Sequence, residues 1–318
     1  MNAAPPKVAL GLGLAEYPFA SAQGFWRWVD LCEQGGADSL WQTDRLVSRV
    51  PILECMTMLA ALAGRTRKLK FGMNVVSLAL RDPVLVAKQC ATIDVLSEGR
   101  LLPAFGIGSP QAPEWAALDI STKTRGAVTD EALEVITRLW REDSVDFAGR
   151  HFRLHRASIA PKPVQPDFPV WIGGSSEAAI RRTARWGTGW QAGAETPDEV
   201  APILAAIRAA TAEAGRAIDE DHYGAGFNFW LGRESDAEPA AAMAAYARRT
   251  GRPAGRGFVV GDAATVFQRI EAYVAAGVTK FVLRPVGAGD EVPLAQTRKL
   301  LEQVLPLVAA RWPRLQKV

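Results

Sequence analysis

The chain has 318 residues, of which 48% are hydrophobic and 22% are charged, and its formal net charge is +3. This balance is typical of a globular protein with a large core and excludes disordered and collagen-like chains. Lysine and arginine number 37 against 34 acidic residues, and no run of basic residues forms a stripe. We therefore expect no nucleic-acid partner.

Three cysteines, Cys32, Cys55 and Cys90, lie far apart in apolar segments and show no CxxC spacing. Their odd number favours reduced, buried thiols in a cytoplasmic protein over a disulfide or zinc framework. The first residues lack the charged and apolar regions of a signal peptide, and no stretch approaches about 18 uninterrupted apolar residues. We expect a cytoplasmic protein without a membrane partner.

Short β-like runs alternate along the chain with longer amphipathic stretches, which favours parallel β/α units. Eight strands are predicted, over residues 7–14, 38–42, 69–76, 100–107, 170–174, 187–192, 223–231 and 279–285. Helices are predicted over residues 23–34, 53–64, 82–99, from 125 onward, 176–186, 197–214, 239–250, 262–276 and 293–311. The helix after Asp82 has an N-cap candidate followed by a proline at the first helical position.

Eight strands that are each followed by a helix predict an α/β fold of the (β/α)8 TIM-barrel type, formed by a single domain over residues 1–318. Such a barrel needs about 250 residues. Residues 108–169, between strands four and five, are predicted to hold most of the excess as an insertion. The proline-rich residues 161–169 must be extended and lead into strand five.

Strand five delivers the most informative residues at the C-terminal end of the barrel, where such folds place their working groups. It ends in Gly173-Gly174-Ser175-Ser176 and passes directly into a helix. The glycines allow close approach of a ligand, Ser175 is a candidate N-cap, and the following amides would point at an anion such as a phosphate. An ordinary strand-to-helix turn explains these residues equally well.

Several other kinds of site find little support in the sequence. His151, His155 and His222 lack the carboxylate-rich spacing of a metal site, so no metal is expected. No GxSxG elbow supports a serine hydrolase. The glycine pairs in residues 11–13 and 106–108 do not complete the GxGxxG of a dinucleotide-binding fold.

Tryptophan is abundant, with ten residues, and Trp41, Trp171 and Trp190 lie near predicted strand ends. Their faces can stack on a flat ring, although core packing explains any one of them as well. A site rich in tryptophan and polar amides and poor in acids and bases suits chemistry performed by a cofactor.

Several ordered motifs resemble those of the bacterial-luciferase-like flavin-dependent monooxygenases. They begin with Arg81-Asp82-Pro83, the run from Ala91 to Arg100 and Gly106-x-Gly108, and continue with Arg125-Gly126, Phe147-x-Gly149-Arg150-His151-Phe152, Pro161-Lys162-Pro163-Val164-Gln165, Val170-x-Ile172-Gly173-Gly174 and Trp186-Gly187-x-Gly189-Trp190. The resemblance covers residues 7–310 and implies a luciferase-like TIM barrel.

The resemblance implies a small-molecule substrate and a cofactor that is either reduced FMN, supplied by a separate reductase, or coenzyme F420. Dimers are common in the family, so a homodimer is expected. The cofactor ring would lie across the C-terminal mouth, with a strained and sometimes cis peptide after strand three and a mobile lid over residues 108–123. The predicted cofactor-binding residues are Trp41, Asn74, Ser77, Gly106, Gly108, Gly173, Gly174, Ser175 and Ser176.

The chain departs from the family pattern at two positions. Many members have Asp-His after strand two, where this chain has Asp44-Arg45, and the F420-dependent dehydrogenases tend to have Glu in place of Ser109. These departures disfavour an alcohol or sugar dehydrogenase. Asp44 and Arg45 are the predicted catalytic residues and would orient the ring or the substrate, and a surface salt bridge of Arg45 is the open alternative.

The sequence thus predicts a flavin-dependent monooxygenase that uses reduced FMN and O2 on a small, largely apolar organic substrate. F420-dependent hydride transfer is the alternative enzyme activity. A catalytically silent flavin-binding barrel is the alternative from another class.

Overall fold

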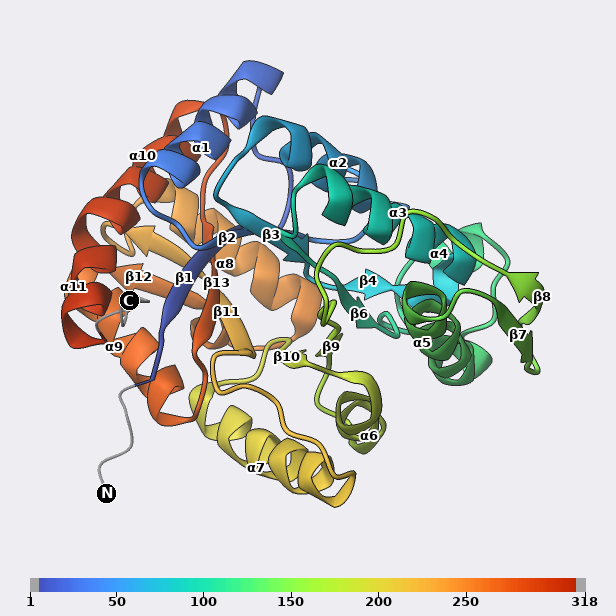
Figure 1. The fold of residues 1–318 in the computed structure, drawn as a ribbon. Coiled ribbons are helices and arrows are strands. Elements are labelled where there is room, and N and C mark those ends of the chain that lie inside the picture. The colour runs from blue at the N-terminus through green and yellow to red at the C-terminus, as the bar shows by residue number, and fades with distance from the viewer. Residues whose placement is uncertain (1–5, 313–318) are drawn as a thin grey trace, which may run out of the picture.

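The computed structural model describes residues 6–312, which form an α/β barrel (Figure 1). Two strands of its wall are broken into halves: β3 (Lys70–Met73) continues as β4 (Val76–Ser77), and β5 (Leu101–Leu102) continues as β6 (Ala104–Gly106). The unbroken strands are β1 (Ala9–Leu14), β2 (Ser39–Gln42), β9 (Trp171–Gly173), β10 (Gly189–Gln191), β11 (Tyr223–Leu231) and β13 (Lys280–Pro285). All eight predicted strands are confirmed.

The strands close into a ring of parallel pairs. In order around the ring they are β1, β2, β3/β4, β5/β6, β9, β10, β11 and β13, and β13 pairs again with β1. The halves β3 and β4 are separated by the Asn74-Val75 peptide, which is cis, as the family resemblance led us to expect. The halves β5 and β6 are separated by Pro103, which has no backbone N–H to donate.

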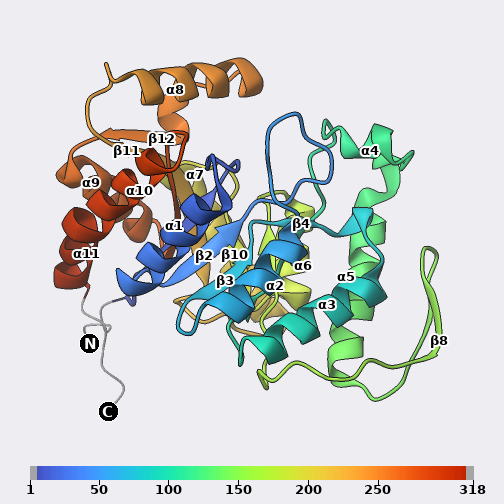
Figure 2. The same ribbon diagram turned by 90° about the horizontal axis from the view of Figure 1, so that it is seen from above.

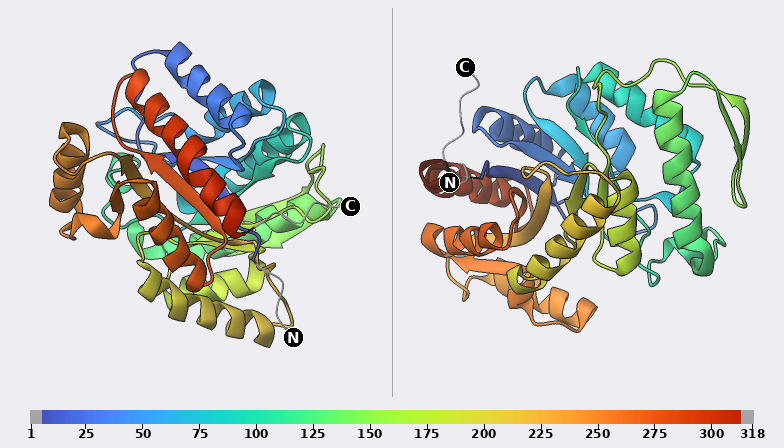
Figure 3. Two further views of the ribbon diagram at one scale, coloured as in Figure 1. Left: turned by 90° about the vertical axis from the view of Figure 1, so that its left-hand side faces the viewer. Right: turned by 60° about the horizontal axis from the view of Figure 1, so that its bottom comes forward.

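Helices surround the strands on the outside (Figure 3). They are α1 (Ala22–Gln34), α2 (Cys55–Arg65), α3 (Pro83–Leu96), α5 (Arg125–Arg141), α6 (Glu177–Trp186), α7 (Pro197–Glu213), α9 (Ala263–Ala275), α10 (Glu291–Lys299) and α11 (Leu305–Arg311). Helix α8 (Ala237–Thr250) lies beyond the ends of the strands, where its Tyr246 packs on Trp230, Phe258 and Val286. Each predicted helix is confirmed, and the Asp82 carboxylate caps α3 by accepting from the Leu85 amide at 2.9 Å. Within residues 6–312 no helix has both the length and the hydropathy to cross a membrane.

Three features add to this barrel. Strand β12 (Phe258–Gly261), which the sequence analysis did not predict, pairs with residues 228–231 of β11 and extends the wall above β10. The segment between β6 and β9 holds a short helix, α4 (Glu114–Ala117), and the covering helix α5. It also holds the hairpin of β7 (Val145–Ala148) and β8 (Arg153–Ala157), which reaches away from the barrel beyond α5 (Figure 2).

The interior of the barrel is filled by two indole rings. Trp41 on β2 and Trp171 on β9 are at most 1% exposed and meet edge to face, with their ring centroids 5.8 Å apart. A Cβ atom on Gly72 would lie 2.8 Å from the Trp41 ring, and one on Gly189 would lie 2.5 Å from the Trp171 ring. Glycine at these inward positions therefore makes the room that the indoles occupy.

At the opposite end of the strands from the mouth, the Lys280 ammonium forms a buried ion pair with the Asp38 carboxylate. Burial raises the pKa of the Asp38 carboxyl, but the Lys280 charge and hydrogen bond outweigh burial and lower the pKa to about 2. Because the carboxyl of the unfolded chain titrates near 3.9, the Asp38 carboxylate stabilises the fold above pH 4 and loses its contribution as the pH falls to about 2. Burial lowers the pKa of the Lys280 ammonium, so the lysine offsets part of this contribution.

We expect Asp38→Asn to lower the free energy of unfolding at pH 7 by about 2 kcal/mol or more, since about two units of pKa shift are lost. The difference from the wild type should narrow between pH 4 and pH 2. Urea denaturation over this pH range measures both effects. The exposed Asp143→Asn is the matched control, and a pH-independent difference would show that the ion pair does not stabilise the fold in this way.

Candidate active site

The mouth of the barrel is organised around the cis peptide between β3 and β4. It places the Val75 side chain across two neighbouring strand ends, where a Cβ atom on Gly106 would lie 2.7 Å and one on Gly173 would lie 2.9 Å from a Val75 methyl group. The Asn74 amide N–H donates to the Gln42 carbonyl at 2.8 Å. The Asn74 side chain, which is half-buried, makes no hydrogen bond within residues 6–312 and is available to a ligand.

Ser77 and Gly108 lie next to one another at this mouth. Gly108 has a φ of +71°, and a Cβ atom there would lie 2.9 Å from the Ser77 hydroxyl and 3.0 Å from the Trp115 ring. Trp115 belongs to α4, is 4% exposed and donates to the Ser109 carbonyl at 2.8 Å. The predicted lid segment thus packs against the ends of β4 and β6, and Gly108 is required where they meet.

The turn after β9 opens into a cavity of about 220 Å³ between α5 and α6. Gly174 adopts a φ of +108°, which favours glycine. The N-cap of α6 is Ser176, whose hydroxyl accepts from the Ala179 amide at 3.3 Å, so the prediction that Ser175 caps this helix was wrong. Ser175 also lines the cavity, and its hydroxyl forms no hydrogen bond with the described residues.

Two polar side chains that the sequence analysis did not assign to the site also line this cavity. The Thr129 hydroxyl on α5 is buried and has no hydrogen-bond partner. Arg182 on α6 is 7% exposed, and its Nε and Nη2 atoms donate to the Asp130 carboxylate. No sequence signal marks Thr129, because only the packing of α5 against the turn brings its hydroxyl to the cavity.

Asp44, a predicted catalytic residue, is engaged in a buried ion pair. Its carboxylate accepts from Arg81 Nη1 at 3.0 Å and Nη2 at 2.7 Å and from the Ser77 amide at 3.0 Å, and its side chain is 2% exposed. Arg81 also reaches the Glu54 carboxylate at 3.2 Å. Burial raises the pKa of the Asp44 carboxyl, and the Arg81 charge opposes this. These contacts hold the end of β4 in place.

Arg45, the second predicted catalytic residue, points toward α4. Its Nη1 lies 3.5 Å from the carboxylate of Glu114, which is 2% exposed and also accepts from the Leu46 amide at 3.2 Å. The ion pair with another acid, which the sequence left open for Arg45, is therefore present. It joins the loop after β2 to the lid segment.

Trp41, Trp171 and Trp190 lie below the surface of the mouth and are at most 1% exposed. Trp41 donates to the Ser39 hydroxyl at 2.9 Å, and Trp190 donates to the Gly174 carbonyl at 2.8 Å. For Trp41, which we predicted to bind the cofactor, the structure therefore shows a packing role, and Trp190 holds the turn at the cavity.

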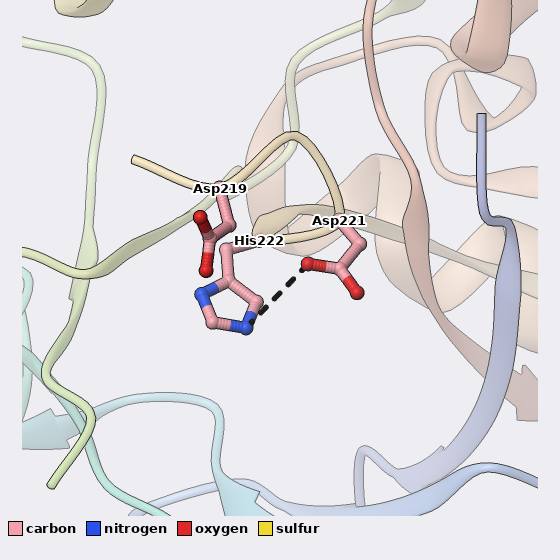
Figure 4. Close-up of side chains that lie close together, drawn as sticks. All are labelled: Asp219, Asp221 and His222. Carbon is pink, nitrogen blue, oxygen red and sulfur yellow. Dashed lines mark ion pairs between the residues drawn. The ribbon is translucent and has the colours of Figure 1, made fainter. Parts of the chain in front are cut away.

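A group of possible metal ligands, Asp219, Asp221 and His222, lies at the other end of the barrel, before β11 (Figure 4). His222 Nδ1 hydrogen-bonds to the Thr188 carbonyl at 2.8 Å, and Asp221 forms an ion pair with Lys7 at 2.8 Å. These contacts account for the histidine and for one of the carboxylates. The group is separate from the mouth and takes no part in its chemistry.

Family comparisons agree with this geometry. Residues 4–257 match the model of the luciferase-like monooxygenase family. The chain belongs to the luciferase-like monooxygenases. As a member of this family it is an enzyme, and its predicted family and barrel fold are confirmed.

Among its relatives, an uncharacterized protein of Mycobacterium tuberculosis is 33% identical over 167 residues, which cover 52% of this chain. The chain spans 57% of the length of that relative. Two solved structures share the luciferase-like fold. An F420-dependent secondary alcohol dehydrogenase, bound to an F420-acetone adduct, has a TM-score of 0.79 at 18% identity, with 94% of this chain and 98% of the other covered.

The second structure is the oxygenating constituent of 3,6-diketocamphane monooxygenase from Pseudomonas putida, in complex with FMN. Its TM-score is 0.76 at 17% identity, with 94% of this chain and 98% of the other covered. At these identities the two likenesses concern the fold alone.

The buried Asp44-Arg81 pair generates a test by double-mutant cycle. We expect Asp44→Asn to lower the free energy of unfolding by about 3 kcal/mol, since it leaves a buried guanidinium without its main partner. Arg81→Met should cost a similar amount, and the double variant should lose much less than the sum. Urea denaturation of the four proteins measures the coupling, and additive losses would contradict it.

Proposed function

We propose that this enzyme is a monooxygenase that binds reduced FMN at the barrel mouth and transfers one oxygen atom of O2 to a small, largely apolar organic molecule. The observation that carries the proposal is the cavity at the N-terminus of α6, which is lined by the ends of β6 and β9 and contains polar groups without protein partners. A cofactor that ends in a phosphate fits this arrangement, because its ring can lie at the mouth while the phosphate occupies the cavity.

The phosphate would be held by the turn of residues 173–176, by the free amides that begin α6 and by the Thr129 hydroxyl. A hydrogen bond to a charged group contributes about 1.5 to 3 kcal/mol, and a helix N-terminus up to about 2 kcal/mol. Arg182 adds a positive charge on the wall of the cavity, although it shares that charge with Asp130. These hydrogen-bond donors and the positive charge suit an anionic group such as a phosphate better than a neutral group.

At the mouth itself, the chain would orient the cofactor ring and exclude water. Asn74 presents an amide without a protein partner, and Ser77 and Gly108 form the adjacent edge. Gly106 and Gly173 have no side chain, so the Val75 side chain can lie directly over the ends of β6 and β9. Reduced flavin, when bound, supplies the activation of dioxygen, so the protein needs to position the two reactants and to keep the site dry.

The acids and bases near the mouth favour oxygen transfer over hydride transfer. Hydride transfer from an alcohol needs a group that accepts the hydroxyl proton. Asp44 is bound by Arg81, and Glu114 faces Arg45. F420-dependent hydride transfer is the second candidate, supported by the fold shared with the alcohol dehydrogenase. A silent flavin-binding barrel is the third, and turnover of any substrate would exclude it.

The remaining expectations belong to this proposal. A separate reductase would supply the reduced flavin.

The apolar residues Leu85 and Leu96 on α3 are 56% and 62% exposed. A homodimer that covers this face would remove them from water.

The phosphate site is tested by Ser175→Asp, which places a negative charge in the cavity. Two unit charges about 4 Å apart repel by about 4 kcal/mol at an effective dielectric constant of about 20. We expect reduced FMN to bind at least about tenfold more weakly than to the wild type. Anaerobic fluorescence titration measures the affinity, the exposed Ser158→Asp is the control, and unchanged affinity of Ser175→Asp would remove the phosphate from this turn.

The choice of cofactor is tested by anaerobic titration of the wild type with oxidised FMN, reduced FMN and F420, followed by absorbance and tryptophan fluorescence. The proposal expects the tightest binding for reduced FMN. When air is then admitted with a panel of substrates, oxygen consumption should equal product formed. Preference for F420 with no oxygen uptake would establish hydride transfer instead.

A further inference from the structure

Arg284 lies on the inward face of β13 near its C-terminal end. Two residues earlier, Val282 fills the interior, where a Cβ atom on Gly13 would lie 2.7 Å from its methyl group. Residues of one strand alternate between the two faces of a sheet, so Arg284 faces the same side one layer higher, at the mouth. It stands in register with Asn228 of β11.

Arg284 is half-buried, and its contacts differ from those of three other cations in the barrel. Arg81, Arg182 and Lys280 each form an ion pair with a carboxylate. Arg284 forms no hydrogen bond or ion pair with any residue of the described part of the chain, residues 6–312. Burial lowers the pKa of its guanidinium to about 10, with only a small opposing effect of Tyr273.

A small apolar cluster, separate from the main core of the barrel, lies directly above Arg284. Val286 lies two residues beyond it on the same face, and Trp230 lies two residues beyond Asn228. These two residues pack with Tyr246 of α8 and Phe258 of β12. Trp230 Nε1 donates to the Asp236 carboxylate at 2.9 Å, which also accepts from the Arg233 amide. A ligand at Arg284 would therefore have a cation below it and aromatic surface beside it.

The position of Arg284 separates it from the proposed phosphate cavity. The cavity is formed at the ends of β6 and β9. In the ring of eight strands, β13 is four steps from β5/β6 in either direction, so the two strands face each other across the mouth. A phosphate in the cavity and an anion at Arg284 would therefore occupy opposite sides of the mouth.

A half-buried cation that is partly removed from water and has no protein partner destabilises a fold unless a ligand supplies the opposite charge. We propose that Arg284 determines substrate specificity by binding an anionic group, a carboxylate attached to an aromatic or other apolar body, that is carried by the substrate. This inference rests on the proposed function in so far as it places the substrate in the mouth beside the cofactor. It narrows the substrate class to apolar carboxylates, whose planar carboxylate matches the two parallel donors of a guanidinium.

The experiment uses benzoate and benzamide as probes, since they have the same shape and differ in charge. The protein is first saturated with FMN, which fills the phosphate cavity, and each probe is titrated by calorimetry. The wild type should bind benzoate at least about tenfold more tightly than benzamide. Arg284→Met should abolish this preference, Arg284→Lys should keep part of it, and the exposed Arg298→Met should keep all of it.

Thermal unfolding of the same variants shows whether Arg284 is retained for binding. Because the half-buried guanidinium has no protein partner, Arg284→Met should leave the Tm unchanged or raise it by about 2 to 4 °C. A residue needed only for the fold would give the opposite sign. Arg284→Lys provides a folded variant if the methionine variant is unstable.

Several outcomes would overturn the inference. They are equal binding of the two probes by the wild type, a preference for benzoate that survives in Arg284→Met, and a loss of FMN affinity in Arg284→Met with no change for benzoate. The last would assign Arg284 to the flavin ring. A preference that depends on Arg284 in a protein that does not bind FMN would refute the proposed function and leave this inference standing.

Discussion

The barrel depends on one packing constraint, which is the closure of eight strands around two indole rings. Trp41 and Trp171 come from strands on different sides of the ring and meet at its centre. Their volume fits only because the facing positions of neighbouring strands, such as Gly72 and Gly189, carry no side chain. A side chain at either position would force the rings or the strands apart, since a close-packed interior has no spare volume.

The packed indole rings of Trp41 and Trp171 close the interior of the barrel, so a ligand can bind only above them, at the mouth. Above the two indoles, the Val75 side chain lies over Gly106 and Gly173 of the next two strands, which leave room for it because they have no side chain. A flat ring can approach such a surface, which bulky side chains on these strand ends would prevent. The same packing that stabilises the barrel thus prepares the mouth for a planar cofactor.

The polar side chains of the mouth fall into two groups, those that pair with one another and those without a protein partner. Asp44 and Arg81 satisfy one another and hold β4, and Glu114 faces Arg45 between the lid and the loop after β2. These four residues stabilise the rim. Thr129 and Arg284, in contrast, keep polar atoms without protein partners on opposite sides of the mouth. Polar groups without a partner lower the stability of the folded protein, and a ligand that hydrogen-bonds to them restores it.

The sequence by itself determined the order of strands and helices, because their periodicity and their capping residues are local properties. It also indicated the turn at residues 173–176 and, through family resemblance, a strained and sometimes cis peptide after strand three. It did not reveal β12, a four-residue strand that exists only because β11 extends beyond β10. Nor did it reveal which side chains meet around the mouth.

The cap of α6 is a local contact, which the sequence analysis placed one residue too early, at Ser175 instead of Ser176. The tertiary structure alone decided that Asp44 and Arg45 are engaged in ion pairs. It also decided that Arg284 has no partner. The physical reason is that an ion pair or an unpaired charge depends on groups from strands far apart in sequence, which only the closure of the barrel brings together.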